Sequence, residues 1–262
     1  MTGVVALHYT VRGEGAPLVL LHGLYGGAGN LNRYVKHFAE HYRVIAPDLR
    51  NHGHSPHDAR MDYPAMAEDV AALLDQEGVE RAAILGHSMG GKVAMTLALT
   101  HPDRVAAVVA ADIAPVAYRH GHAKLMASMQ ALDLASAAGR REVDAALAGR
   151  VSSPAVRQFL LKNLELRPEG GYRWRIPLEI LSRAVPALEG FPEFDGTYPG
   201  PALFVYGERS DYFDPKRHGS TVRAYFPRAE MVGLPDAGHW LHAEQPEAFT
   251  EAVEGFLHTV YT

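Results

Sequence analysis

Residues 81–94 read RAAILGHSMGGKVA, and this stretch decides the fold. The run RAAIL is short and apolar, which is typical of a buried strand, and a helical pattern runs from Ser88 to Thr100. Between them stands Gly86-His87-Ser88-Met89-Gly90, a G-x-S-x-G sequence in a strand–turn–helix setting. This setting is typical of a nucleophile elbow, so the sequence predicts Ser88 as a nucleophile at a helix amino terminus. The alternative is a glycine-rich turn in which Ser88 only caps the helix.

Short apolar runs alternate with helical patterns along much of the chain, which predicts a mostly parallel sheet covered by helices. The expected strands are Val4–Val11, Pro17–Leu21, Arg43–Ala46, Arg81–Leu85, Val105–Ala111, Ala202–Tyr206 and Glu230–Leu234. The expected helices are Asn30–His41, Tyr63–Gln76, Ser88–Thr100 and Pro246–Val260.

One segment breaks this alternation. From Tyr118 to Leu188 the chain has helical patterns and only one short strand-like run, Tyr172–Arg175. An insertion of this length is too long for a loop, so we expect a folded helical cap at 117–189 on a core domain of 1–116 and 190–262. Some apolar cap residues could line an acyl pocket, although such residues more often hold helices together: Met126, Met129, Phe159, Leu160 and Trp174.

Composition excludes several classes of function. The 262 residues include 25 Lys+Arg and 30 Asp+Glu, a formal net charge of -5, so there is no basic stripe for nucleic acid. Cysteine is absent, which excludes disulfides, thiolate catalysis and Cys-ligated metals. The longest apolar run, Val105–Ala111, is far shorter than the roughly 20 residues of a membrane span, and no signal-peptide pattern opens the chain. We expect a soluble cytoplasmic protein, and its oligomeric state is left open.

Two further loops carry groups that suit a serine nucleophile. His22-Gly23-Leu24 follows the strand PLVLL, and in this arrangement the backbone N–H groups of Leu24 and Met89 would form an oxyanion hole. Asp236-Ala237-Gly238-His239-Trp240 follows the last expected strand. A general base must come from the same sheet edge as the nucleophile, and among 15 histidines His239 is the one so placed late in the chain.

The motifs HGLYG, PDLRNHGHSP, GHSMGGKVA, DIAP and AGHWLHAEQPEAF together resemble the α/β-hydrolase superfamily and, within it, the YbfF-like esterases. The resemblance spans roughly residues 16–115 and 198–260 and is thin in the cap. It implies an eight-stranded, mostly parallel sheet with the cap between strands 6 and 7. It also implies a Ser-His-Asp triad, an acyl-serine intermediate, an oxyanion hole at Leu24 and Met89, and no cofactor.

The acid that orients His239 has two possible positions. The usual superfamily position, three residues after Gly207, holds Ser210, and Asp211 comes one residue later. Asp112 ends the apolar run VVAA, where a buried carboxylate would need a partner such as the histidine. YbfF-like proteins resemble this arrangement, with an Asp after the sixth strand and a Ser after the seventh. We favour Asp112, with Ser210 as a second hydrogen-bond partner and Asp211 as the alternative.

His52-Gly53-His54-Ser55-Pro56-His57-Asp58 superficially resembles the H-x-H-x-D-H pattern of dinuclear zinc hydrolases, but Pro56 stands where that pattern needs Asp. We therefore expect no metal.

The sequence predicts a hydrolase of small-molecule carboxylic esters that acts through an acyl-serine. Other triad chemistry on the same fold stays open, namely thioester hydrolysis, perhydrolysis and carbon–carbon hydrolysis, as does a non-enzymatic ligand receptor. The acyl chain length and the alcohol stay open too.

Overall fold

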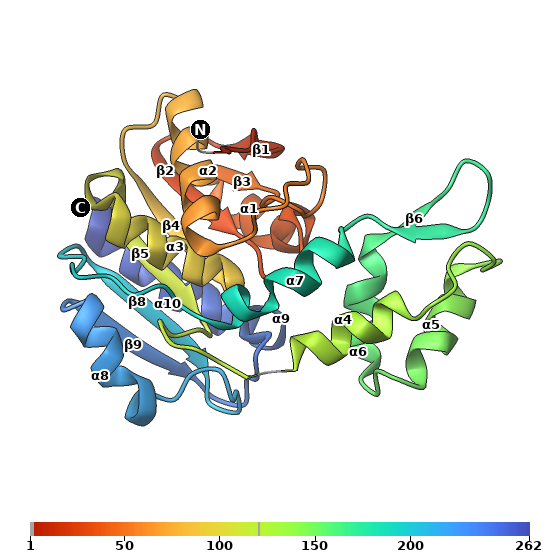
Figure 1. Cartoon of the computed structure of the whole chain (residues 1–262). Helices are drawn as coiled ribbons and strands as arrows, with labels where there is room; N and C mark the ends of the chain where they lie inside the picture. The colour runs from red at the N-terminus through yellow and green to blue at the C-terminus, as the bar shows by residue number, and fades with distance from the viewer. Residues whose placement is uncertain (1–2, 120) are drawn as a thin grey trace.

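The structure, a computed structural model, describes residues 3–119 and 121–262. Its centre is a sheet of seven strands in the order β1-β3-β2-β4-β5-β8-β9 (Figure 1). The strands are β1 (Tyr9–Arg12), β2 (Ala16–Leu21), β3 (Tyr42–Pro47), β4 (Ala82–His87), β5 (Val105–Ala111), β8 (Ala202–Gly207) and β9 (Ala229–Leu234). All neighbours are parallel except β1 and β3. The mostly parallel sheet is therefore confirmed.

The sheet has one strand fewer in the described residues than the eight that the resemblance implied. The run expected from Val4 to Val11 pairs only in its last part, as β1. Before β1 the Val5 N–H donates to the buried carboxylate of Asp69 (2.7 Å) instead of to a neighbouring strand. The chain there packs on helix α2 (Tyr63–Gln76) through a side chain and does not extend the sheet.

Helices cover both faces of the sheet, as Figure 1 shows. In β2, Val19 and Leu21 pack with α2 and α3 (Met89–Thr100), whereas Leu18 and Leu20 pack with α1 (Asn32–Phe38) and α10 (Pro246–Tyr261). Because successive strand residues point to opposite faces, a strand that is covered on both sides is apolar throughout. The remaining core elements are the 3-10 turns η1 (Ala28–Leu31) and η2 (Pro102–Arg104) and the helices α8 (Pro215–Tyr225) and α9 (Leu241–Glu244).

We call residues 117–189 the cap, keeping the predicted bounds. It contains α4 (His122–Gln130), α5 (Arg140–Ala148), α6 (Pro154–Leu160), η3 (Leu161–Asn163), β6 (Leu164–Leu166), β7 (Tyr172–Trp174) and α7 (Leu178–Glu189). The expected strand at Tyr172–Arg175 is β7, and it pairs antiparallel with β6 in a hairpin at the outer end of the cap (Figure 1). The sequence does not predict β6, because three residues are too few to show a period.

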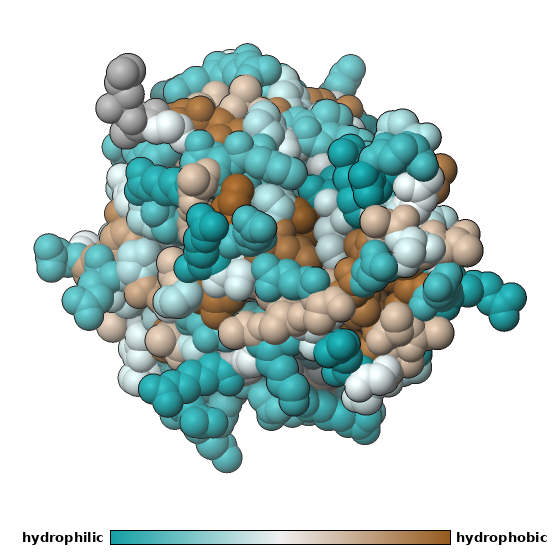
Figure 2. All heavy atoms as spheres, turned by 45° about the vertical axis from the view of Figure 1, so that its right-hand side comes forward, coloured by the Kyte–Doolittle hydropathy of each residue, from teal (hydrophilic) through white to brown (hydrophobic). Residues whose placement is uncertain are grey.

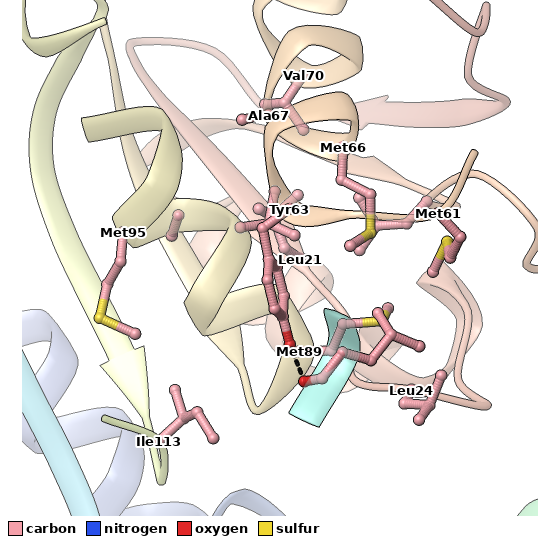
Figure 3. Packing of buried hydrophobic residues seen from close by; sticks show 14 of the residues in the cluster. Leu21, Leu24, Met61, Tyr63, Met66, Ala67, Val70, Met89, Met95 and Ile113 are labelled. Carbon is pink, nitrogen blue, oxygen red and sulfur yellow. Dashed lines mark hydrogen bonds between the residues drawn. The ribbon is translucent and has the colours of Figure 1, made fainter. Parts of the chain in front are cut away.

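Hydrogen bonds tie the cap to the core close to the predicted elbow. The Tyr63 hydroxyl of α2 donates to the Leu188 carbonyl of α7 at 2.6 Å. Figure 3 shows the Tyr63 side chain among Leu21, Leu24 and Met89, with its hydroxyl reaching that carbonyl. Of the helices that the structure describes, none is long and apolar enough to cross a membrane.

Candidate active site

Ser88 stands in the sharp turn between β4 and α3, with φ 54° and ψ -117°. A non-glycine residue adopts this conformation only under strain, which the surrounding packing must hold. Two glycines make the turn possible. A Cβ on Gly86 would lie 2.1 Å from the Gly90 carbonyl oxygen, and one on Gly90 would lie 2.4 Å from the Leu21 carbonyl oxygen. The chain at Ser88 thus has the sharp strand–turn–helix elbow that the sequence predicts. This elbow brings the end of β2 against the start of α3.

The structure brings three of the predicted residues into one hydrogen-bonded path. The Ser88 Oγ lies 3.1 Å from the His239 Nε2, and the His239 Nδ1 lies 2.7 Å from the Asp112 Oδ2. They come from three different loops: Ser88 follows β4, Asp112 follows β5, and His239 lies between β9 and α9. The carboxyl ends of parallel strands meet at one sheet edge, which explains why residues so far apart in sequence meet.

The environment of Asp112 suits a buried carboxylate. The residue is fully buried and has φ 53°. Its Oδ1 accepts from the Gly207 N–H at 3.1 Å, and its Oδ2 accepts from the Ser210 hydroxyl as well as facing His239. Donors on both oxygens offset the cost of removing the charge from water. Asp211, by contrast, is exposed on the loop after β8.

Two neighbours of His239 were not predicted from the sequence. The Tyr212 ring stacks on the imidazole, with centroids 3.6 Å apart and an interplanar angle of 14°. His87 donates from Nε2 to the His239 backbone carbonyl at 2.8 Å. Burial lowers the pKa of His87 to about 3, so it stays neutral at physiological pH. No motif marks either role, although both residues adjoin predicted site residues in sequence.

The predicted oxyanion loop runs beside the nucleophile, since a Cβ on Gly23 would lie 3.4 Å from the Ser88 Cβ. The Gly23 carbonyl accepts from the His22 Nδ1–H at 2.9 Å and from the Gly26 N–H at 3.0 Å. This carbonyl belongs to the same peptide as the Leu24 N–H. Both hydrogen bonds therefore fix the orientation of a predicted oxyanion donor.

Two buried histidines stabilise this loop by accepting hydrogen bonds from backbone N–H groups. His22 accepts at Nε2 from the Leu49 N–H (2.9 Å), and His52 accepts at Nε2 from the Tyr25 N–H (3.2 Å). Burial lowers the pKa of His22 and takes that of His52 to about 3, so both act as neutral hydrogen-bonding groups. His52 belongs to the zinc-like stretch, and its ring is occupied here by backbone partners. Within 3–119 and 121–262, no three His, Cys, Asp or Glu side chains cluster as a metal site would require.

A cavity of about 730 Å³ opens beside Ser88 and His239 and reaches under the cap. Val156, Phe159 and Leu160 of the cap line it. On the cap side of the molecule, Figure 2 shows hydrophobic surface surrounded by hydrophilic side chains. Of the cap residues considered from sequence, Phe159 and Leu160 reach this cavity. The other three pack inside the cap, where Met126 and Met129 are fully buried and the Trp174 Nε1–H donates to the Met129 carbonyl at 3.1 Å.

Comparison with known proteins agrees with this geometry. Residues 16–246 match the α/β hydrolase fold family. The chain is 39% identical over 255 residues to the sn-1-specific diacylglycerol lipase ABHD11 of Danio rerio, which covers 94% of this chain and 80% of that one. It is 36% identical over 243 residues to Esterase YbfF of Escherichia coli K12, with 92% and 93% covered. A solved marine microorganism esterase superposes with a TM-score of 0.93 at 37% identity, over 96% of this chain and 99% of that one.

The chain therefore belongs to the α/β-hydrolase family, and the resemblance inferred from its motifs is confirmed. By homology it is an ester hydrolase.

Proposed function

We propose that this protein hydrolyses carboxylic esters through an acyl-serine on Ser88, with His239 as general base and acid and Asp112 as the orienting acid. The observation that carries the proposal is the unbroken path from Ser88 through His239 to Asp112, at 3.1 Å and 2.7 Å. The Asp112 carboxylate accepts a hydrogen bond from the Nδ1–H of His239. The unprotonated Nε2 of the neutral imidazole is therefore the base that faces Ser88.

Each step uses groups that lie along this path. His239 Nε2 takes the proton of the Ser88 hydroxyl as its oxygen attacks the ester carbonyl, and the N–H groups of Leu24 and Met89 hold the oxyanion. The tetrahedral intermediate collapses, and His239 gives the proton to the departing alcohol oxygen. Water then attacks the acyl-serine by the same route, releasing the carboxylic acid and restoring Ser88.

The substrate class is an ester with a large apolar group. The cavity of about 730 Å³ has room for one, and its cap wall is apolar at Val156, Phe159 and Leu160. Thioester hydrolysis, perhydrolysis and carbon–carbon hydrolysis would use the same path.

The test is hydrolysis of p-nitrophenyl acetate and butyrate by the wild type and by Ser88→Ala. We expect sustained turnover by the wild type and a loss of at least about a thousandfold in kcat for Ser88→Ala, because the variant lacks the hydroxyl that forms the acyl-enzyme in the proposed mechanism. Ser128→Ala is a matched control. Ser128 is a buried cap serine whose hydroxyl donates to the Lys124 carbonyl one turn earlier in its own helix, and its loss should leave kcat unchanged.

Retained turnover in a clean Ser88→Ala preparation would refute the assignment of the nucleophile. A single stoichiometric burst of p-nitrophenol from the wild type would instead indicate a ligand receptor that keeps the fold without turnover.

A further inference from the structure

Two hollows of very different size adjoin Ser88, and they share Leu24, His122 and Tyr212 in their walls. The large cavity of about 730 Å³ has both Ser88 and His239 in its wall. The other hollow has a volume of only about 20 Å³ and lies against Ser88, Met89, Ile113 and Leu188. His239 is not among the described residues that line this small hollow. A volume of this size holds roughly one or two water-sized groups.

The wall of the small hollow is held by hydrogen bonds between buried groups. The Tyr63 hydroxyl donates to the Leu188 carbonyl at 2.6 Å, and the Tyr118 hydroxyl donates to the Tyr212 carbonyl at 2.6 Å. The Lys92 ammonium, 1% exposed, donates to the Gly190 carbonyl at 2.5 Å. Enlarging the hollow would break such bonds and leave buried polar groups unpaired, which costs about 1–3 kcal/mol each. These bonds therefore oppose widening of the hollow on the side of Tyr63, Tyr118 and Lys92.

The direction of each substrate group follows from the reaction. The oxyanion must face the N–H groups of Leu24 and Met89, and the leaving oxygen must reach His239 Nε2 to be protonated. Because His239 lies in the wall of the large cavity, the alcohol extends into that cavity. The acyl group takes the remaining direction, on the flank of Ser88 formed by Met89, Ile113 and Leu188.

We propose that the small hollow is the acyl subsite and the large cavity is the alcohol subsite. The enzyme is then selective for short acyl groups, of the size of acetyl, esterified to large apolar alcohols. This inference rests on the proposed function of Ser88 and adds the orientation of the ester in the site.

Isomeric esters test the orientation in the wild-type protein. Hexyl acetate and ethyl hexanoate have the same atoms and nearly the same hydrophobicity, and only the direction of the ester differs. We expect kcat/KM to be at least about tenfold higher for hexyl acetate, because the six-carbon acyl chain does not fit the small hollow. Equal values, or a preference for ethyl hexanoate, would overturn the inference alone. If the wild type hydrolyses neither isomer and does not hydrolyse p-nitrophenyl acetate either, the proposed function is overturned, and the inference with it.

A pair of leucine variants tests which hollow holds the acyl group. Leu188→Ala removes three carbons from the wall of the small hollow while keeping the carbonyl that Tyr63 bonds. We expect it to raise the ratio of kcat/KM for ethyl butanoate over ethyl acetate by about tenfold. Leu181→Ala makes the same change at a fully buried position of the same helix, away from both hollows, and should leave the ratio unchanged. A folded Leu188→Ala protein with the wild-type ratio, or an equal rise in Leu181→Ala, would overturn the subsite assignment. If Leu188→Ala does not fold, the isomer comparison decides.

Discussion

Asp112 holds a left-handed backbone conformation, φ 53°, immediately after β5. Its own N–H donates to the Val205 carbonyl at 2.8 Å, and its carboxylate accepts from Gly207 and Ser210. The strain of the backbone is thus held by bonds to the neighbouring strand β8 and the loop after it. These contacts aim one carboxylate oxygen at His239 and support Asp112 as the orienting acid.

Replacing Asp112 by Asn is expected to lower kcat by on the order of 10²- to 10⁴-fold. An amide carries no charge to stabilise the imidazolium, and its NH₂ would face N–H or O–H donors. Asp211→Asn is the matched control and should change kcat less than twofold, because Asp211 is exposed. Steady-state kinetics with p-nitrophenyl acetate decides between them. Strong loss in Asp211→Asn with full activity in Asp112→Asn would make Asp211 the acid.

Sequence alone favours Ser88 and His239 clearly, because each stands in the loop after its strand that this chemistry needs. It leaves the acid between two positions, since loop spacing does not tell which carboxylate bends back toward the sheet edge. The stacking of Tyr212 on His239 has no sequence signal at all, because it depends on how the loop after β8 closes over the ring.

Lys92 gives a prediction for pH. Burial lowers its pKa from 10.5 to about 7, although the ammonium lies over the rings of Tyr63 and Tyr118. Between pH 7 and 10.5 the unfolded chain keeps a proton that the folded chain has released. Unfolding then takes up a proton, and Lys92 makes the free energy of unfolding rise with pH.

Urea denaturation of the wild type and of Lys92→Met at pH 7, 8 and 9 measures this effect. We expect the difference in unfolding free energy, wild type minus variant, to increase with pH by up to about 1.4 kcal/mol per pH unit. Burial raises the pKa of both Tyr63 and Tyr118, so neither titrates in this range. A difference in unfolding free energy between the wild type and Lys92→Met that stays constant from pH 7 to 9 would contradict the lowered pKa of Lys92.

At the scale of elements, the loop after β2 is held from the core and from the cap together. Asn163, at the end of η3, donates from Nδ2 to the Tyr25 carbonyl at 2.7 Å. The same peptide supplies the Gly26 N–H that donates to Gly23, whose peptide in turn carries the Leu24 N–H. A bond from the cap thus continues through two peptides to a predicted oxyanion donor, and bonds in such a chain strengthen one another. The contact joins residues 138 positions apart, so no local pattern could predict it.

We expect Asn163→Leu to lower kcat by about three- to tenfold with a smaller change in KM. The lost hydrogen bond is worth about 1 kcal/mol and acts on the donor that holds the oxyanion. Ser128→Ala again serves as the control, because it removes a hydrogen bond inside the cap that does not reach the loop. An equal loss in both variants, or a change in KM alone, would mean that Asn163 supports the cap and not the oxyanion loop.

For the whole molecule, periodicity predicts the sheet well, since each of the seven apolar runs supplies one of the seven strands. The first predicted strand, Val4–Val11, begins too early. The Val5 N–H donates to Asp69, which is buried on α2, and not to a neighbouring strand. The hairpin β6–β7 is predicted only in its second strand. These gaps share a cause, since in each a partner distant in sequence decides the local structure.

The buried pair of Arg50 and Asp69 joins that amino-terminal stretch to the core. Arg50 bonds both carboxylate oxygens at 2.6 Å and also donates to the carbonyls of Gly3, Arg60 and Ala65. Both side chains are 0% exposed. Arg50→Met leaves a buried carboxylate without its cation, so we expect the free energy of unfolding to fall by about 3–5 kcal/mol. Adding Asp69→Leu removes the unpaired charge and should recover part of that loss. Urea denaturation measures both. A double variant no more stable than Arg50→Met would show that the lost bonds, from the arginine to the three carbonyls and from the Val5 N–H to Asp69, outweigh the removal of the unpaired charge.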